Sequence, residues 1–173
     1  MLAACIFSSC KQKTDYSKEI AQLDSALVKL NAAGTVFLAI DTNALRTSDL
    51  FFKEKLRMIR EKLSGDTVKK ITAQFLSEAY EQEGYLANMM DNKKFLARAI
   101  EEGRKRMLGL KHDLGEDLIE KNKAAIYIVT ELGSSEKICD AMNGAIEKAK
   151  SATARLDSMK TRVIFLADSL GSK

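Results

Sequence analysis

The sequence contains no proline and no tryptophan, and it has one histidine, three cysteines and nine glycines among 173 residues. A proline inside a helix removes a backbone donor and clashes with the preceding turn, so the absence of proline favours long uninterrupted helices. The single histidine, His112, excludes every site that needs two. Among these are the paired Glu-x-x-His motifs of di-iron bundles and the helix motif of zinc peptidases.

No residue pattern in the chain predicts an enzyme. No two cysteines have Cys-x-x-Cys spacing, which argues against a thiolate zinc site or a redox pair. The stretch GRKRMLG (103–109) lacks a preceding strand and the Gly-Lys-Ser/Thr ending of a phosphate loop. We interpret His112 as a solvated turn residue, and Met89 and Met90 as core residues rather than haem ligands. The sequence therefore predicts no catalytic residue, no metal site and no cofactor.

The charges that are present have both signs throughout the chain. Lysine and arginine number 28 and aspartate and glutamate 24, which gives a net charge of +4. The densest basic stretch, residues 93–106, also contains Glu101 and Glu102. A nucleic-acid surface needs a face of one sign with aromatic side chains for stacking. We therefore predict solvated helix surfaces and no nucleic-acid partner.

Periodic apolar residues predict long helices in the second and third parts of the chain. Turn signals at LSGDTV (63–68) and DLGEDL (113–118), each with a central glycine, divide residues 15–170 into three segments. Seven-residue steps of apolar residues pass through Asp91-Asn92 and Gly133-Ser134-Ser135 without a change of phase, so we expect both segments to be continuous. Cys139 falls on this pattern, which favours an inert core thiol. The main row of the third segment is Leu114, Lys121, Ile128, Ser135, Met142, Ala149, Leu156, Val163 and Leu170.

The first segment is less regular, because its apolar row shifts by one residue after Phe37. Either one helix drifts against the seven-residue repeat, or the chain breaks near Asp41-Thr42-Asn43 or Thr47-Ser48-Asp49. The fold class that we predict is all-α: an elongated antiparallel three-helix bundle or coiled coil, with helices of about 45–55 residues and roughly 70–80 Å. The alternative is a four- to five-helix bundle, if a segment folds back on itself.

Three apolar clusters exceed what a narrow helical row requires: TVFLAI (35–40), AAIYIV (124–129) and RVIFLA (162–167). They have two possible roles. They could widen the core of a globular bundle, or they could form a surface for self-association or for a protein partner, because large exposed apolar patches usually mark interfaces.

The N-terminal stretch LAACIFSSCKQK (2–13) is too short to span a bilayer, which needs about 20 apolar residues. Its residues Phe7-Ser8-Ser9-Cys10 resemble the lipobox of bacterial lipoproteins, in the style of the Bacteroidota. In that family small residues precede a cysteine whose thiol receives a diacylglyceryl group. The resemblance implies that Cys10 is the lipid attachment site, that residues 1–9 are the end of a truncated signal peptide, and that residues 10–15 form a tether. Residues 16–171 are then the helical-bundle domain.

The sequence before Cys10 has no Lys/Arg-rich region, so we expect a start at an internal methionine of a longer signal peptide. The resemblance implies a non-enzymatic envelope lipoprotein, anchored to a membrane, that acts as a structural or protein-interaction module. Only Asp15 provides negative charge shortly after the cysteine, which favours a position facing the periplasm. The alternatives are a periplasmic holdase-type chaperone, although no strand-forming trimerisation segment is visible, and a cytosolic coiled-coil adaptor.

Overall fold

The computed structural model describes residues 14–63 and 68–170, and within these ranges it contains four helices and no strand. The helices are α1 (Ser17–Leu38), α2 (Thr42–Lys62), α3 (Lys70–Gly115) and α4 (Lys121–Ser169). The prediction of an all-α protein is confirmed. The predicted turn at 63–68 falls mostly outside the described residues.

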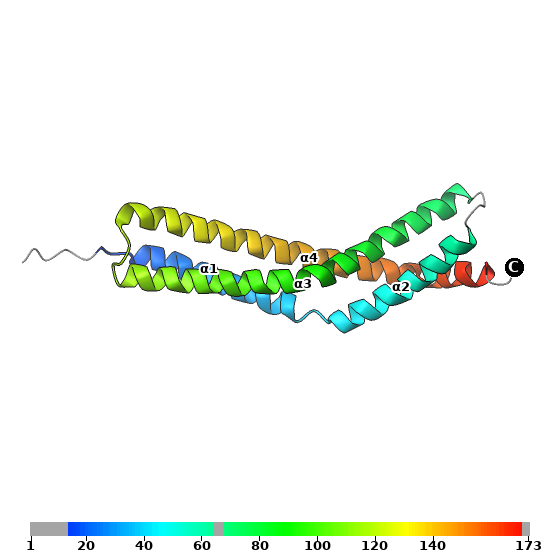
Figure 1. Ribbon diagram of the computed structural model, residues 1–173, viewed down its shortest axis with the longest axis horizontal. Coiled ribbons are helices and arrows are strands. Elements are labelled where there is room, and N and C mark those ends of the chain that lie inside the picture. The colour runs from blue at the N-terminus through cyan, green and yellow to red at the C-terminus, as the bar shows by residue number, and fades with distance from the viewer. Residues whose placement is uncertain (1–13, 64–67, 171–173) are drawn as a thin grey trace, which may run out of the picture.

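The helices form an elongated bundle in which α3 and α4 run antiparallel over most of its length (Figure 1). Helix α1 packs against both of them in one half of the bundle, and α2 packs against both in the other half. With 49 residues, α4 is about 74 Å long at 1.5 Å per residue. The predicted count of three helices was wrong, because the first segment is divided into α1 and α2. Each half of the bundle nevertheless has three helices side by side.

The division between α1 and α2 lies at residues 39–41, where the chain bends by 48°. The Asp41 side chain begins α2 by accepting hydrogen bonds from the backbone N–H groups of Asn43, at 2.8 Å, and Ala44, at 3.1 Å. This is the N-cap arrangement that satisfies the first free donors of a helix. The single continuous helix of the predicted three-helix bundle is thus wrong, and the chain breaks at the first of the two alternative places, Asp41-Thr42-Asn43. A break at Thr47-Ser48-Asp49 is excluded because those residues lie inside α2.

Lys93 stabilises the same break from the opposite side. Its Nζ donates to the carbonyl oxygens of Leu38, at 3.1 Å, and Ile40, at 2.7 Å. These carbonyls lie at and just beyond the end of α1, where a helix leaves acceptors without an internal partner, and a cation there also interacts favourably with the helix dipole. The break is therefore held by a residue of α3 as well as by its own cap.

Most of the core comes from the apolar rows that the periodicity predicts, although Lys121, in the main row, and Leu118 and Ala125, in its companion row, are exposed. The row in α4 is buried from Ile128 to Val163, and α4 continues through Gly133-Ser134-Ser135 as expected. Asp91 and Asn92 are exposed on a continuous α3, which was also expected. The largest fully buried side chains are Phe37, Phe52, Leu23, Leu30, Leu56, Ile59, Leu86, Met107, Leu114, Met142, Leu156 and Val163.

The turn between α3 and α4 differs in detail from the predicted one. Gly115 is the last residue of α3, and Asp117 has the positive φ of 55°. The N–H of Leu118 donates to the carbonyl of Asp113 at 2.9 Å, and that of Asp117 donates to the carbonyl of Leu114 at 3.2 Å. This pair of bonds is the Schellman motif, and aspartate is among the few residues other than glycine that visit its left-handed position. The turn leaves the Leu118 side chain exposed.

Candidate functional site

Cys10, the predicted lipid attachment site, belongs to residues 1–13, which lie outside the described part of the chain. The described chain starts with Thr14 and Asp15 at the end of the bundle where α3 turns into α4 (Figure 1). The Asp15 carboxylate accepts a hydrogen bond from the Ser17 N–H at 2.9 Å, and this bond lowers the pKa of Asp15. The predicted tether thus leads directly into α1.

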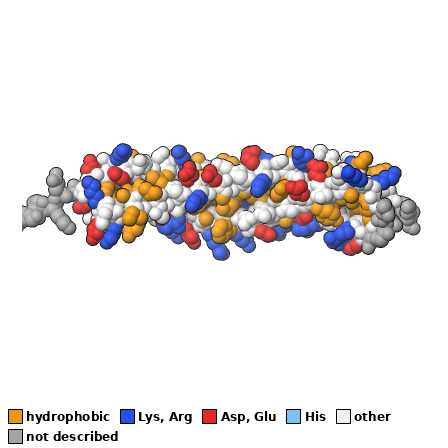
Figure 2. All heavy atoms as spheres, turned by 90° about the horizontal axis from the view of Figure 1, so that it is seen from above, with side chains coloured by type: hydrophobic (Ala, Val, Ile, Leu, Met, Phe, Trp, Pro, Cys, Tyr) orange, Lys and Arg blue, Asp and Glu red, His pale blue; other side chains and the backbone are white. Residues whose placement is uncertain are grey.

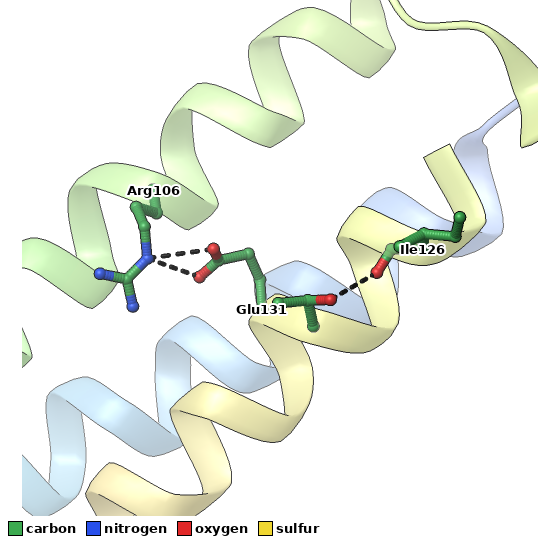
Figure 3. Close-up of polar contacts among 4 residues, drawn as sticks. Arg106, Ile126 and Glu131 are labelled. Atoms are coloured by element: carbon green, nitrogen blue, oxygen red, sulfur yellow. Dashed lines mark hydrogen bonds and ion pairs between the residues drawn. The ribbon is translucent and has the colours of Figure 1, made fainter. Parts of the chain in front are cut away.

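Polar contacts between helices fix this end of the bundle. The buried Tyr16 donates its hydroxyl to the Ile119 carbonyl at 3.3 Å, which joins the start of α1 to the α3–α4 turn. Arg106 Nε of α3 lies 3.0 Å from both carboxylate oxygens of Glu131 in α4 (Figure 3). Lys111 of α3 also forms an ion pair with Asp24 of α1. The point where the chain enters the bundle therefore has a defined position relative to the α3–α4 turn.

The three apolar clusters contribute both to the core and to the surface. Phe37, Ile128 and Val163 are buried, one from each cluster, and all three belong to the predicted apolar rows. Their neighbours in the sequence point outward, and charged side chains of both signs surround the exposed hydrophobic groups on the face in Figure 2. The exposed members are Val36, Leu38, Ile126, Tyr127, Val129 and Phe165.

A groove of about 650 Å³ runs between α1 and α4, and Cys139 forms part of its wall. Small residues such as Ala26, Ala33 and Ser135 line it from both helices. Cys139 is half-buried and packs against the core, as its place in the apolar rows predicts. Burial raises the pKa of its thiol, and the nearby Asp140 carboxylate raises it further. Because the thiolate is the nucleophilic form, a raised pKa lowers the nucleophilicity of this thiol at neutral pH.

The other residues considered from the sequence lie apart from one another. His112 is exposed near the end of α3, with its Nδ1 3.3 Å from Asp113 Oδ1. Met89 is buried in the core, as expected, and Met90 packs against it. Within residues 14–63 and 68–170, no three His, Cys, Asp or Glu side chains are grouped so that they could hold a metal ion.

A buried polar cluster between α2 and α3 was not predicted. Asp49 of α2 is only 4% exposed, and its Oδ2 accepts from Lys53 Nζ at 3.1 Å. The same Nζ lies 3.3 Å from Oε1 of Glu83, whose side chain is 13% exposed. The sequence did contain a signal, because Asp49 occupies a core position between Leu45 and Phe52.

Glu83 has an unusual protonation equilibrium. Burial raises the pKa of its carboxyl above the ordinary 4.5, a hydrogen bond with the Asp49 carboxyl raises it further, and Lys53 only partly counteracts the two effects. Among the described residues, Asp49 Oδ1 has no hydrogen-bond donor, and Glu83 Oε1 faces Lys53 Nζ in an ion pair at 3.3 Å. A proton on Glu83 would supply a donor to Asp49 and remove one buried charge, and an unpaired buried charge is costly.

We expect Glu83→Gln to stabilise the protein relative to the wild type by an amount that grows as the pH rises from acid to neutral. A raised folded-state pKa means that the contribution of Glu83 is fully present below pH 4.5 and is lost as the pH rises through the folded pKa. Glutamine cannot lose a proton, so the variant keeps this contribution. The measurement is the melting temperature between pH 4 and 7, followed by circular dichroism. Glu54→Gln, at an exposed position of α2, should show no such trend, and equal trends in both variants would contradict the assignment.

No single helix in the described part of the chain is long and apolar enough to cross a membrane. The bent pair of α1 and α2 passes the same test of length and composition when the two are taken together. The buried residues of this pair, including Leu23, Leu30 and Phe52, belong to the core of the bundle.

Comparisons with known proteins identify no relative: no protein-family model matches the chain, and no curated protein or solved structure is significantly similar to it.

Proposed function

We propose that this chain is a non-enzymatic lipoprotein of the bacterial envelope, anchored through Cys10, whose helical bundle acts as a structural or protein-interaction module. The observation that carries the proposal is the lipobox-like stretch Phe7-Ser8-Ser9-Cys10, which ends only six residues before Tyr16. Tyr16 is the first buried residue of the bundle. The proposed anchor is thus separated from the folded body by a short polar tether.

The dimensions of the bundle support a role at a distance from the membrane. Residues 10–15 span at most about 20 Å when fully extended. The bundle adds about 74 Å, because α4 has 49 residues. Its sides offer the groove between α1 and α4 and exposed apolar residues such as Val36 and Phe95. A protein partner or a second copy of the chain would bind along these sides.

The test of the anchor is Cys10→Ala in the cell. We expect the wild type in the membrane fraction, resistant to extraction by salt, because two or more acyl chains give stable anchoring. Its N-terminal peptide should begin at Cys10 and carry the mass of the lipid. Cys10→Ala should lose the lipid and move to the soluble fraction, because no acyl chain is then attached.

Cys139→Ala is the matched control, since it removes another thiol, one that packs against the core. This variant should remain in the membrane fraction with an unchanged N-terminal peptide. An unmodified wild-type chain that still carries residues 1–9 would contradict the proposal, and so would a Cys10→Ala variant that stays in the membrane fraction.

A further inference from the structure

Exposed apolar side chains lie at the end of the bundle where the tether enters. Leu118 in the α3–α4 turn is 67% exposed, and Ile126 and Val129 in the first turns of α4 are 64% and 71% exposed. A shallow groove at this end is lined by Thr14, Asp15 and Val129 together, so the end of the tether and Val129 are neighbours. Leu118 directly precedes Ile119, whose carbonyl accepts the hydrogen bond from Tyr16. We call Leu118, Ile126 and Val129 the proximal tip.

We propose that the proximal tip rests on the surface of the lipid bilayer, with the remainder of the bundle directed away from it. The inference rests on the anchor at Cys10 proposed above. From Cys10 to Asp15 the chain reaches at most about 20 Å, and it ends beside Val129. A lipid attached at Cys10 therefore keeps the tip close to the bilayer, where its apolar side chains can leave water.

The contacts within this end of the bundle keep the tip in place. Tyr16 holds the start of α1 to the turn through Ile119, and Arg106 and Glu131 hold α3 to α4 (Figure 3). These contacts fix the backbone that carries the side chains of the proximal tip. Because this end of the bundle is already folded, contact with lipid requires no ordering of the chain around Leu118.

The charges around the tip indicate which lipid it suits. Glu116, Asp117 and Glu120 are negative, and Lys121 and Lys123 are positive. Anionic headgroups attract basic segments and repel acidic ones. A mixed set of charges gives no net attraction to an anionic surface, so the apolar side chains provide the contact and a zwitterionic bilayer is suitable for it.

The experiment uses a single tryptophan, because the chain has none of its own. Leu118→Trp is made in the full chain with Cys5→Ala and Cys139→Ala, which leaves Cys10 as the only thiol. Cys10 is coupled to a maleimide phospholipid in phosphatidylcholine vesicles whose acyl chains are brominated or not. If the tip lies about 5–10 Å into the boundary between headgroups and acyl chains, tryptophan emission should shift to the blue and be quenched roughly twofold by the bromines.

Phe165→Trp in the same background is the matched control, because Phe165 is 70% exposed and lies near the opposite end of α4. Its emission should be the same with and without vesicles. Val129→Trp provides a second reporter at the tip, which should respond like Leu118→Trp.

Emission at positions 118 and 129 that vesicles leave unchanged would overturn the proposal. Quenching at position 165 equal to that at position 118 would also overturn it, because the bundle would then lie along the bilayer. The lipid is attached chemically, so neither result depends on whether a cell acylates Cys10. Failure of this inference and failure of the proposed anchor are thereby distinguished.

Discussion

Replacing Gly84, Gly109, Gly133 and Gly144 with alanine in one variant should raise the free energy of unfolding by about 3–4 kcal/mol. All four glycines lie inside α3 or α4. A Cβ added at any of them meets no described atom within 4 Å. Glycine in a helix loses more conformational freedom on folding than alanine does, which costs roughly 0.8–1 kcal/mol per residue. Sites without shared contacts contribute almost additively.

The measurement is urea unfolding, followed by the circular dichroism signal of the α-helix. Gly103→Ala is the control, because there the added Cβ would lie 3.3 Å from Ile138 Cδ1 and 3.5 Å from Leu30 Cδ2. Crowding at this buried position should offset the gain in helix propensity. A fourfold variant no more stable than the wild type would show that open space at these glycines does not translate into stability.

Phe52→Ala should lower the free energy of unfolding by about 3–5 kcal/mol. The Phe52 side chain is 1% exposed in the core between α2, α3 and α4. Its ring also meets the ring of Phe51 edge to face, with centroids 5.2 Å apart. Removing the ring leaves a cavity that the long helices on either side can fill only in part. The variant therefore loses the transfer free energy of the ring and also bears the cost of the cavity.

Phe95→Ala is the corresponding control, because the Phe95 side chain is 69% exposed and its removal creates no cavity. Its effect should stay within about 0.5 kcal/mol. The two variants are compared by urea unfolding under the same conditions. Equal losses would mean that Phe95 is buried in solution, for example between two copies of the chain, and would contradict its assignment to a free surface.

The long helices could be predicted because their information is local and repeated. The apolar residues of α3 and α4 recur at helical spacing without proline to interrupt them, so residues such as Leu86, Met142 and Leu156 were recognisable as core. The shift of the apolar row after Phe37 marked the first segment as irregular, but it left a drifting helix and two places for a break open, and the structure has the break before Asp41. The spacing of apolar residues indicates which face of a helix is buried, and a change in the phase of that spacing indicates where the helix is irregular.

The features that escaped prediction depend on residues distant in the sequence or on a choice between similar turns. Lys93 reaches the end of α1 across more than fifty positions of sequence, and no local pattern contains that contact. Gly115 appeared the natural turn residue, but Asp117 occupies the left-handed position. The pairing of Asp49 with Glu83 requires the register of α2 against α3, which neither helix specifies alone. The role of Cys10 as a lipid attachment site is a prediction from resemblance alone, and Cys10 lies outside the described residues.

The opposite placement of the two helix ends has a mechanical consequence. The start of α1 and the end of α4 lie at opposite ends of the bundle, and α1 and α4 run in the same direction (Figure 1). Tension applied between Ser17 and Ser169 would therefore act parallel to the packed helices and slide them past each other, instead of peeling one away turn by turn. Sliding strains all of the interlocked side chains at once, so a load along this axis would meet more resistance than a load that peels one helix away.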